Sequence, residues 1–117
     1  MLGNEAAVLR AALAELDAVD ADEHLRVLSD RAAMTAGLNY YRMWDDALDE
    51  LTDVTVPTLY VWGTADPALG RTPAEATKDF VRAPYRFEVF DGVGHWIPEV
   101  AADRLVSLLL AHFEAAP

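Results

Sequence analysis

Apolar and polar positions follow two different periods along this sequence, and the change falls close to residue 52. In residues 1–51 apolar side chains recur every three or four positions and proline is absent, which is typical of α-helices. The spacing predicts a helix over about 8–16, a short second helix around Leu25 and Leu28, and a third over about 31–51. The third helix has one apolar stripe, formed by Met34, Leu38, Tyr41, Trp44, Leu48 and Leu51.

Two short runs in residues 52–117 have the composition of buried strands. The run 56–62 is rich in β-branched and aromatic residues and ends before Gly63, and the run 85–90 has a similar character. A helical pattern lies between the strands and another follows them. The order strand, helix, strand, helix predicts an α/β fold with parallel strands. We therefore expect a helical segment over 1–51 and a β-α-β-α part over 52–117.

The helix between the two strands has a recognisable start. Thr72, Pro73 and Glu75 have the spacing of a capping box, in which a hydroxyl and a carboxylate satisfy the first backbone amides of a helix. This helix is expected to direct Ala76, Phe80 and Val81 inward. The last helix is expected to pack through Ala101, Leu105, Leu108, Leu109 and Phe113.

A sheet of two parallel strands is incomplete, because both of its edges expose unpaired backbone groups. We therefore expect further strands, either from a missing N-terminal half or from another chain. A second copy that exchanges strands or covers the sheet edge, giving a homo-oligomer without catalytic activity, is one alternative.

Composition narrows the classes of function. The formal charge of −11 argues against nucleic acids and anionic membranes as partners, because both require a cationic surface. Cysteine is absent, which excludes disulfides, thiolate zinc sites and a cysteine nucleophile. No metal or cofactor site is expected, and no Gly-rich phosphate loop is present. The sequence shows neither a signal peptide nor an apolar run long enough to span a bilayer, so a cytoplasmic location is expected.

Two residues stand where the chemistry of parallel sheets is usually found. Asp66 follows the first predicted strand and His95 follows the second. Functional groups in such sheets lie beyond the carboxyl ends of the strands, and neighbouring strands are about 5 Å apart. An aspartate that accepts a hydrogen bond from one imidazole nitrogen leaves the other nitrogen free to act as a base. The spacing therefore predicts an acid and histidine pair.

The stretches 56–67 and 92–99, which contain Asp66 and His95, resemble the acid loop and the histidine loop of α/β-hydrolases. Gly94-His95-Trp96 and the segment 38–42 (Leu-Asn-Tyr-Tyr-Arg) are most similar to the epoxide hydrolase and haloalkane dehalogenase branch. The resemblance implies that 1–51 derives from the helical cap and 52–117 from the C-terminal part of the core. It also implies a small-molecule substrate and a role for Tyr41, whose phenol would donate a hydrogen bond to the epoxide oxygen. Tyr41 also lies on the apolar stripe, where an aromatic side chain can belong to the core instead.

The third member of such a triad is absent from the sequence. A nucleophile elbow has the form Gly-x-Ser-x-Gly or Gly-x-Asp-x-Gly, and neither occurs here. The only serines, Ser29 and Ser107, fall within predicted helices. We therefore expect the isolated chain to be inactive, and its function to depend on a part that carries the nucleophile. With an aspartate nucleophile the chemistry would be that of epoxide hydrolases; with a serine nucleophile it would be that of an esterase.

Overall fold

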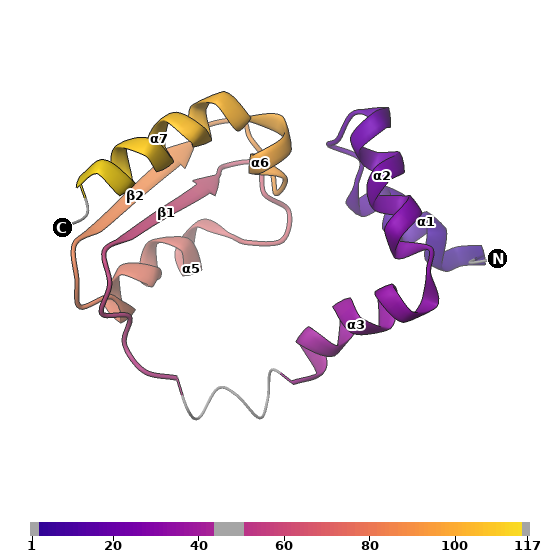
Figure 1. Ribbon diagram of the computed structural model, residues 1–117, viewed down its shortest axis with the longest axis horizontal. Helices are drawn as coiled ribbons and strands as arrows, with labels where there is room; N and C mark the ends of the chain where they lie inside the picture. The colour runs from indigo at the N-terminus through magenta and orange to yellow at the C-terminus, as the bar shows by residue number, and fades with distance from the viewer. Residues whose placement is uncertain (1–2, 44–50, 116–117) are drawn as a thin grey trace. The chain divides into compact units, whose positions relative to one another are not determined.

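The computed structural model describes residues 3–43 and 51–115, and their contacts divide the chain into two units, Met1–Leu51 and Thr52–Pro117 (Figure 1). None of the helices in the described ranges is sufficiently long and apolar to cross a membrane.

The first unit is helical. It contains α1 (Gly3–Ala12), α2 (Ala18–Leu28) and α3 (Arg31–Arg42), and its buried side chains are Leu13, Leu16 and Leu25. Helix α2 begins at Ala18, seven residues before Leu25, because the Asp17 carboxylate accepts hydrogen bonds from the amides of Val19 and Asp20, both at 2.9 Å. Asp30 caps α3 in the same way, through the amide of Ala33.

The prediction of a continuous helix to residue 51 is wrong. Helix α3 ends at Arg42, and Leu51 is not helical. Leu38 and Tyr41 are 43% and 63% exposed, so the expected stripe does not form a buried core within this unit. Trp44 and Leu48, which also belong to the stripe, lie outside the described residues.

The second unit has the α/β architecture predicted from the sequence. Strands β1 (Thr58–Gly63) and β2 (Tyr85–Phe90) are parallel, with a register that runs from Thr58 opposite Tyr85 to Gly63 opposite Phe90. Helix α5 (Arg71–Ala76) and the 3-10 helix η2 (Thr77–Phe80) connect the strands, and α6 (Ile97–Val100) and α7 (Ala102–Ala115) follow. In Figure 1, α5 and α7 run along opposite sides of the strand pair. Because the described sheet has two strands only, it is incomplete.

The core of this unit is small and centres on the two strands. Phe90 is completely buried, and Trp62 and Ala74 are 5% and 1% exposed. The guanidinium of Arg104, on α7, lies 3.8 Å from the centre of the Phe90 ring and donates a 3.1 Å hydrogen bond to the Val89 carbonyl. Arg104 thereby ties α7 to the end of β2.

The predicted capping box is also wrong. Helix α5 begins at Arg71 after Gly70, and no side chain caps it. The Glu75 carboxylate pairs with the Arg71 guanidinium at 3.0 Å, one helical turn away, instead of reaching back to a Thr72 amide. Of the side chains expected to point inward, Ala76 and Val81 are half-buried but Phe80 is 64% exposed.

Candidate functional site

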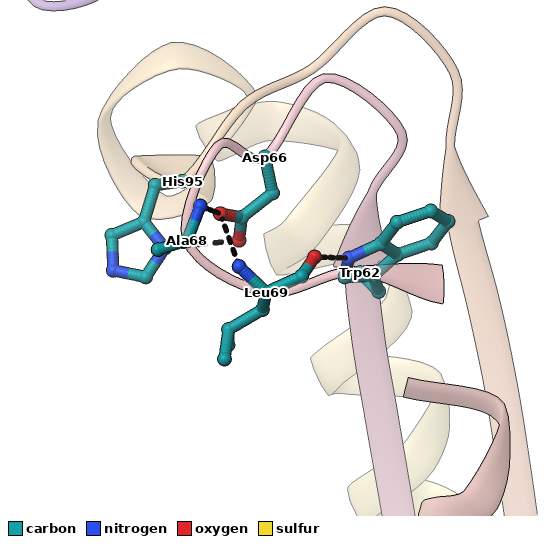
Figure 2. A network of polar contacts seen from close by, with 5 residues as sticks. All are labelled: Trp62, Asp66, Ala68, Leu69 and His95. Atoms are coloured by element: carbon teal, nitrogen blue, oxygen red, sulfur yellow. Dashed lines mark hydrogen bonds and ion pairs between the residues drawn. The ribbon is translucent and has the colours of Figure 1, made fainter. Parts of the chain in front are cut away.

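The strand register brings the two predicted site residues to the same edge of the sheet. Both strands end at the paired residues Gly63 and Phe90, and the chain leaves each into a loop. Asp66 lies in the loop after β1 and His95 in the loop after β2. Their side chains meet, with 2.9 Å between Asp66 Oδ2 and His95 Nδ1 (Figure 2).

The Asp66 carboxylate is held by its own loop. Its Oδ1 atom accepts hydrogen bonds from the backbone amides of Ala68 at 2.7 Å and Leu69 at 3.0 Å, which leaves Oδ2 directed at His95 (Figure 2). Short Asp side chains commonly stabilise turns in this way. The Asp66 side chain is only 5% exposed, whereas that of His95 is 46% exposed. The carboxylate is therefore fixed, and the imidazole is open to solvent.

Electrostatics determines which atom carries the proton. Burial by itself would raise the pKa of Asp66, but the hydrogen bonds from His95 and from the Leu69 and Ala68 amides outweigh it and hold this pKa below its ordinary value. The carboxylate is thus ionised at neutral pH and can only accept hydrogen bonds. His95 Nδ1 must then be the donor, so Nε2 is the basic nitrogen of the neutral ring.

A buried tryptophan, Trp62, is hydrogen-bonded to the backbone of the acid loop. The Trp62 indole N–H donates a 2.7 Å hydrogen bond to the carbonyl of Leu69, the residue whose amide binds Asp66 (Figure 2). The Arg71 guanidinium lies 5.0 Å from the centre of the Trp62 ring. From sequence, Trp62 is predicted only as the last residue of the strand run 56–62, and its polar contact has no signal in the sequence.

The two loops also contact each other directly. The Ala65 amide donates to the Val93 carbonyl at 2.9 Å, and the Thr64 amide donates to the Phe90 carbonyl at 3.0 Å. A Cβ atom on Gly63 would overlap the carbonyl oxygens of Val93 and Gly94, so only glycine permits this close approach. Gly63 appears in the sequence merely as the end of a strand, but its position between strand and acid loop is the available signal.

Tyr41, the third predicted site residue, belongs to the other unit. It lies in the last turn of α3, is 63% exposed, and its ring packs edge-on against Tyr40 with 5.6 Å between ring centres. Asp66 and His95 belong to the unit Thr52–Pro117, and the positions of the two units relative to each other are not determined. A role for Tyr41 therefore stays a prediction.

The other candidate groups do not form a nucleophilic or metal site. The hydroxyl of Ser29 donates to the Leu25 carbonyl and that of Ser107 to the Asp103 carbonyl, so both are engaged by helix backbones. Within residues 3–43 and 51–115, no cluster of three or more His, Asp or Glu side chains is arranged to hold a metal ion.

Comparison with known proteins identifies relatives of one enzyme family. No protein-family profile matches the sequence. Epoxide hydrolase A of Mycobacterium tuberculosis is 34% identical over 85 residues, which cover 68% of this chain and 26% of that protein. Epoxide hydrolase 3 of Xenopus tropicalis is 36% identical over 72 residues, which cover 61% of this chain and 20% of that protein.

Comparison with solved structures also identifies an epoxide hydrolase as a relative. The crystal structure of epoxide hydrolase A from Mycobacterium thermoresistibile matches with a TM-score of 0.73 and 28% identity, over 88% of this chain and 34% of that one. The chain thus spans about a quarter of the length of the relatives it matches in sequence. Sequence and fold together show that the chain is an α/β-hydrolase homologue of the epoxide hydrolase type and corresponds to a C-terminal portion of that fold.

Proposed function

We propose that this chain supplies the acid, Asp66, and the base, His95, of an epoxide hydrolase catalytic triad, and that a further part carries the nucleophile. The observation that supports this most directly is the 2.9 Å contact between Asp66 Oδ2 and His95 Nδ1 at the carboxyl ends of two parallel strands. A buried carboxylate on one side of an imidazole and solvent on the other is the arrangement that a general base requires.

The reaction proposed is the addition of water to an epoxide in two steps. A carboxylate nucleophile attacks one epoxide carbon, the carbon–oxygen bond breaks, and the oxygen takes the electron pair and a proton from a phenol. A covalent ester results. Water then attacks the ester carbonyl while His95 Nε2 accepts a proton from it. His95 returns this proton to the departing alcohol, the diol leaves, and the other water proton returns through solvent to the phenolate.

Asp66 has a supporting part in these steps. Its negative charge stabilises the imidazolium that forms when His95 accepts the proton, and its hydrogen bond keeps Nε2 unprotonated beforehand. Asp66 is unsuited to be the nucleophile itself, because its two oxygens are occupied by His95 and by two backbone amides.

Tyr41 is the proposed proton donor in the first step. This assignment comes from the resemblance of residues 38–42 to the cap segment of epoxide hydrolases, and the 63% exposure of the side chain is compatible with contact to a substrate. The prediction is that Tyr41→Phe slows epoxide opening, with His95-dependent ester cleavage unchanged.

The nucleophile is proposed to come with additional strands. The described sheet has two strands, each with one partner, so the outer edges of β1 and β2 are where another segment would pair. Because this sequence has no nucleophile elbow, we expect no measurable turnover from the chain alone.

A chimera tests the proposal. The present chain would replace the corresponding C-terminal part of the Mycobacterium tuberculosis epoxide hydrolase A, and hydrolysis of styrene oxide would be measured. We expect activity in the chimera and a loss of roughly 10²–10⁴-fold with His95→Ala. His112→Gln is the matched control, because His112 lines a cavity with Pro57 and Pro84 at the opposite ends of the strands. Activity that survives His95→Ala, or turnover by the isolated chain, would contradict the proposal.

A further inference from the structure

One hydroxyl group joins the acid loop to the histidine loop. Thr64 is the first residue after β1, and its Oγ1 atom donates a 3.0 Å hydrogen bond to Oδ1 of Asp91. The same oxygen accepts a 2.8 Å hydrogen bond from the backbone amide of Gly92. Asp91 and Gly92 are the first two residues after β2, so a single side chain spans the start of both loops.

The position of these bonds matters because of the turn that they fix. Gly92 has a φ of 73°, in the left-handed region that glycine enters without steric cost. The turn is closed by a long hydrogen bond of 3.4 Å from the Val93 amide to the Phe90 carbonyl, so a further contact can stabilise it. The hydrogen bond from the Gly92 amide to Thr64 is such a contact, and the bond to Asp91 orients the hydroxyl as its acceptor.

His95 follows this turn by three residues, and its ring also contacts the Trp96 ring edge-on, with 6.0 Å between ring centres. The backbone bond from Ala65 to Val93 fixes the middle of the loop, and Gly63 permits the close approach there. The beginning of the loop depends on Thr64. With both points fixed, the imidazole is presented to Asp66 in one orientation.

We propose that Thr64 is a positioning residue. Its hydroxyl connects the acid loop to the histidine loop by hydrogen bonds and thereby holds His95 Nδ1 against Asp66. The importance of this orientation for catalysis rests on the function proposed above, but the structural effect can be measured without turnover.

The test uses the whole 117-residue chain and long-range ¹H–¹⁵N NMR of the His95 ring at a pH where the ring is neutral. The wild type is expected to show the Nδ1–H tautomer alone. Thr64→Val keeps the shape of the side chain and removes both hydrogen bonds, so we expect the Nε2–H tautomer to appear beside it. Thr64→Ser retains the hydroxyl and should restore the single tautomer. Thr72→Val, at an exposed position of helix α5, is the matched control and should match the wild type.

A second variant covers the case in which Thr64→Val fails to fold. Asp91→Ala removes an exposed partner of the hydroxyl and leaves the Gly92 bond possible, so a smaller but detectable fraction of Nε2–H tautomer is expected. A folded Thr64→Val chain with the wild-type tautomer would overturn the inference, as would an unchanged Asp91→Ala spectrum if Thr64→Val is unfolded. Either result would leave the assignment of Asp66 and His95 standing, whereas chimera activity that survives His95→Ala would contradict that assignment and not the role of Thr64.

Discussion

Replacing Asp66 by asparagine or by alanine separates two contributions of its carboxylate. Alanine removes the acceptor for the Ala68 and Leu69 amides together with the contact to His95. Asparagine can keep an oxygen in the Oδ1 position for the two amides, but it places an NH₂ group opposite His95 Nδ1. The imidazole must then accept at Nδ1 and carry its proton on Nε2, which is the wrong tautomer for a base.

The magnitudes follow from the bonds that each variant loses. Three hydrogen bonds at roughly 1 kcal/mol net each give a destabilisation of about 3 kcal/mol for Asp66→Ala. Asp66→Asn retains two of them in neutral form, so its cost is expected to be about 1 kcal/mol. In the chimera, the tautomer change predicts a fall in kcat of the order of 10⁴-fold for Asp66→Asn.

The difference in stability between the wild-type chain and Asp66→Asn should also depend on pH. Because the pKa of Asp66 is lowered on folding, its ionisation stabilises the folded state above the ordinary value of 3.8, and this stabilisation is lost as the pH falls through the folded value. The wild-type chain should therefore approach Asp66→Asn in stability below about pH 4. A group with a raised pKa would give the opposite sign.

Urea unfolding at neutral and acidic pH, followed by tryptophan fluorescence, measures these differences in the free energy of unfolding. Trp62 is a suitable reporter because it is only 5% exposed and contacts the acid loop. Asp79→Ala, at an exposed position of η2, is the control for loss of a surface carboxylate. If Asp66→Ala destabilised the chain no more than Asp79→Ala does, the acid loop would not depend on the Asp66 hydrogen bonds and the reasoning would be refuted.

Three further substitutions test the packing around the pair, each by urea unfolding followed by circular dichroism, because Trp62→Phe removes the fluorescent reporter. Trp62→Phe keeps an aromatic ring but removes the N–H donor to Leu69, so we expect a loss of about 1–2 kcal/mol and a rise in the pKa of Asp66; an unchanged pKa would show that the indole does not support the loop. Gly63→Ala forces a methyl group against the Val93 and Gly94 carbonyls and should cost at least about 2 kcal/mol, a prediction that wild-type stability would contradict. Phe90→Ala empties the centre of the core and should cost about 3–5 kcal/mol, whereas Phe80→Ala, at a position 64% exposed, should stay within about 0.5 kcal/mol; equal effects would place the core elsewhere.

The strands were predictable because their β-branched and aromatic residues form a clear composition, although only Trp62, Gly63 and Phe90 are buried in them. The bounds of β2 match the predicted run 85–90, and the order of elements correctly implied parallel pairing. Strand β1 begins two residues later than the predicted run. Pro57 has no amide to donate, and the first ladder bond is made by the Thr58 amide to the Pro84 carbonyl.

Helix boundaries were less predictable because several local interactions compete for the same groups. Thr72 and Glu75 fit a capping box by spacing, but the ion pair between Arg71 and Glu75 uses the same carboxylate within a helix that starts earlier. Similarly, the apolar spacing of residues 31–51 continues past Arg42, where α3 ends with Met43 as its C-cap. An apolar spacing of three or four residues indicates a shared helix face only where the helix itself is continuous.

For the site, the sequence predicted the pair and not its support. Asp66 and His95 could be predicted because strand ends converge in a parallel sheet, whatever the details of the loops. The bonds from Trp62 to Leu69 and from Thr64 to Asp91 depend on the path of two loops in space. The last of these joins residues 27 positions apart, and side-chain contacts at such a distance leave no periodic trace in one sequence.

A single-turnover experiment tests most directly whether His95 is the base of a hydrolase. The epoxide hydrolase A chimera carrying His95→Gln would be mixed with styrene oxide and the protein analysed by mass spectrometry. We predict that one equivalent of substrate becomes bound as an ester and persists, while the chimera with the native histidine releases diol continuously. Continuous diol release by the His95→Gln chimera, with no ester retained, would contradict the assignment of His95 as the residue that activates water.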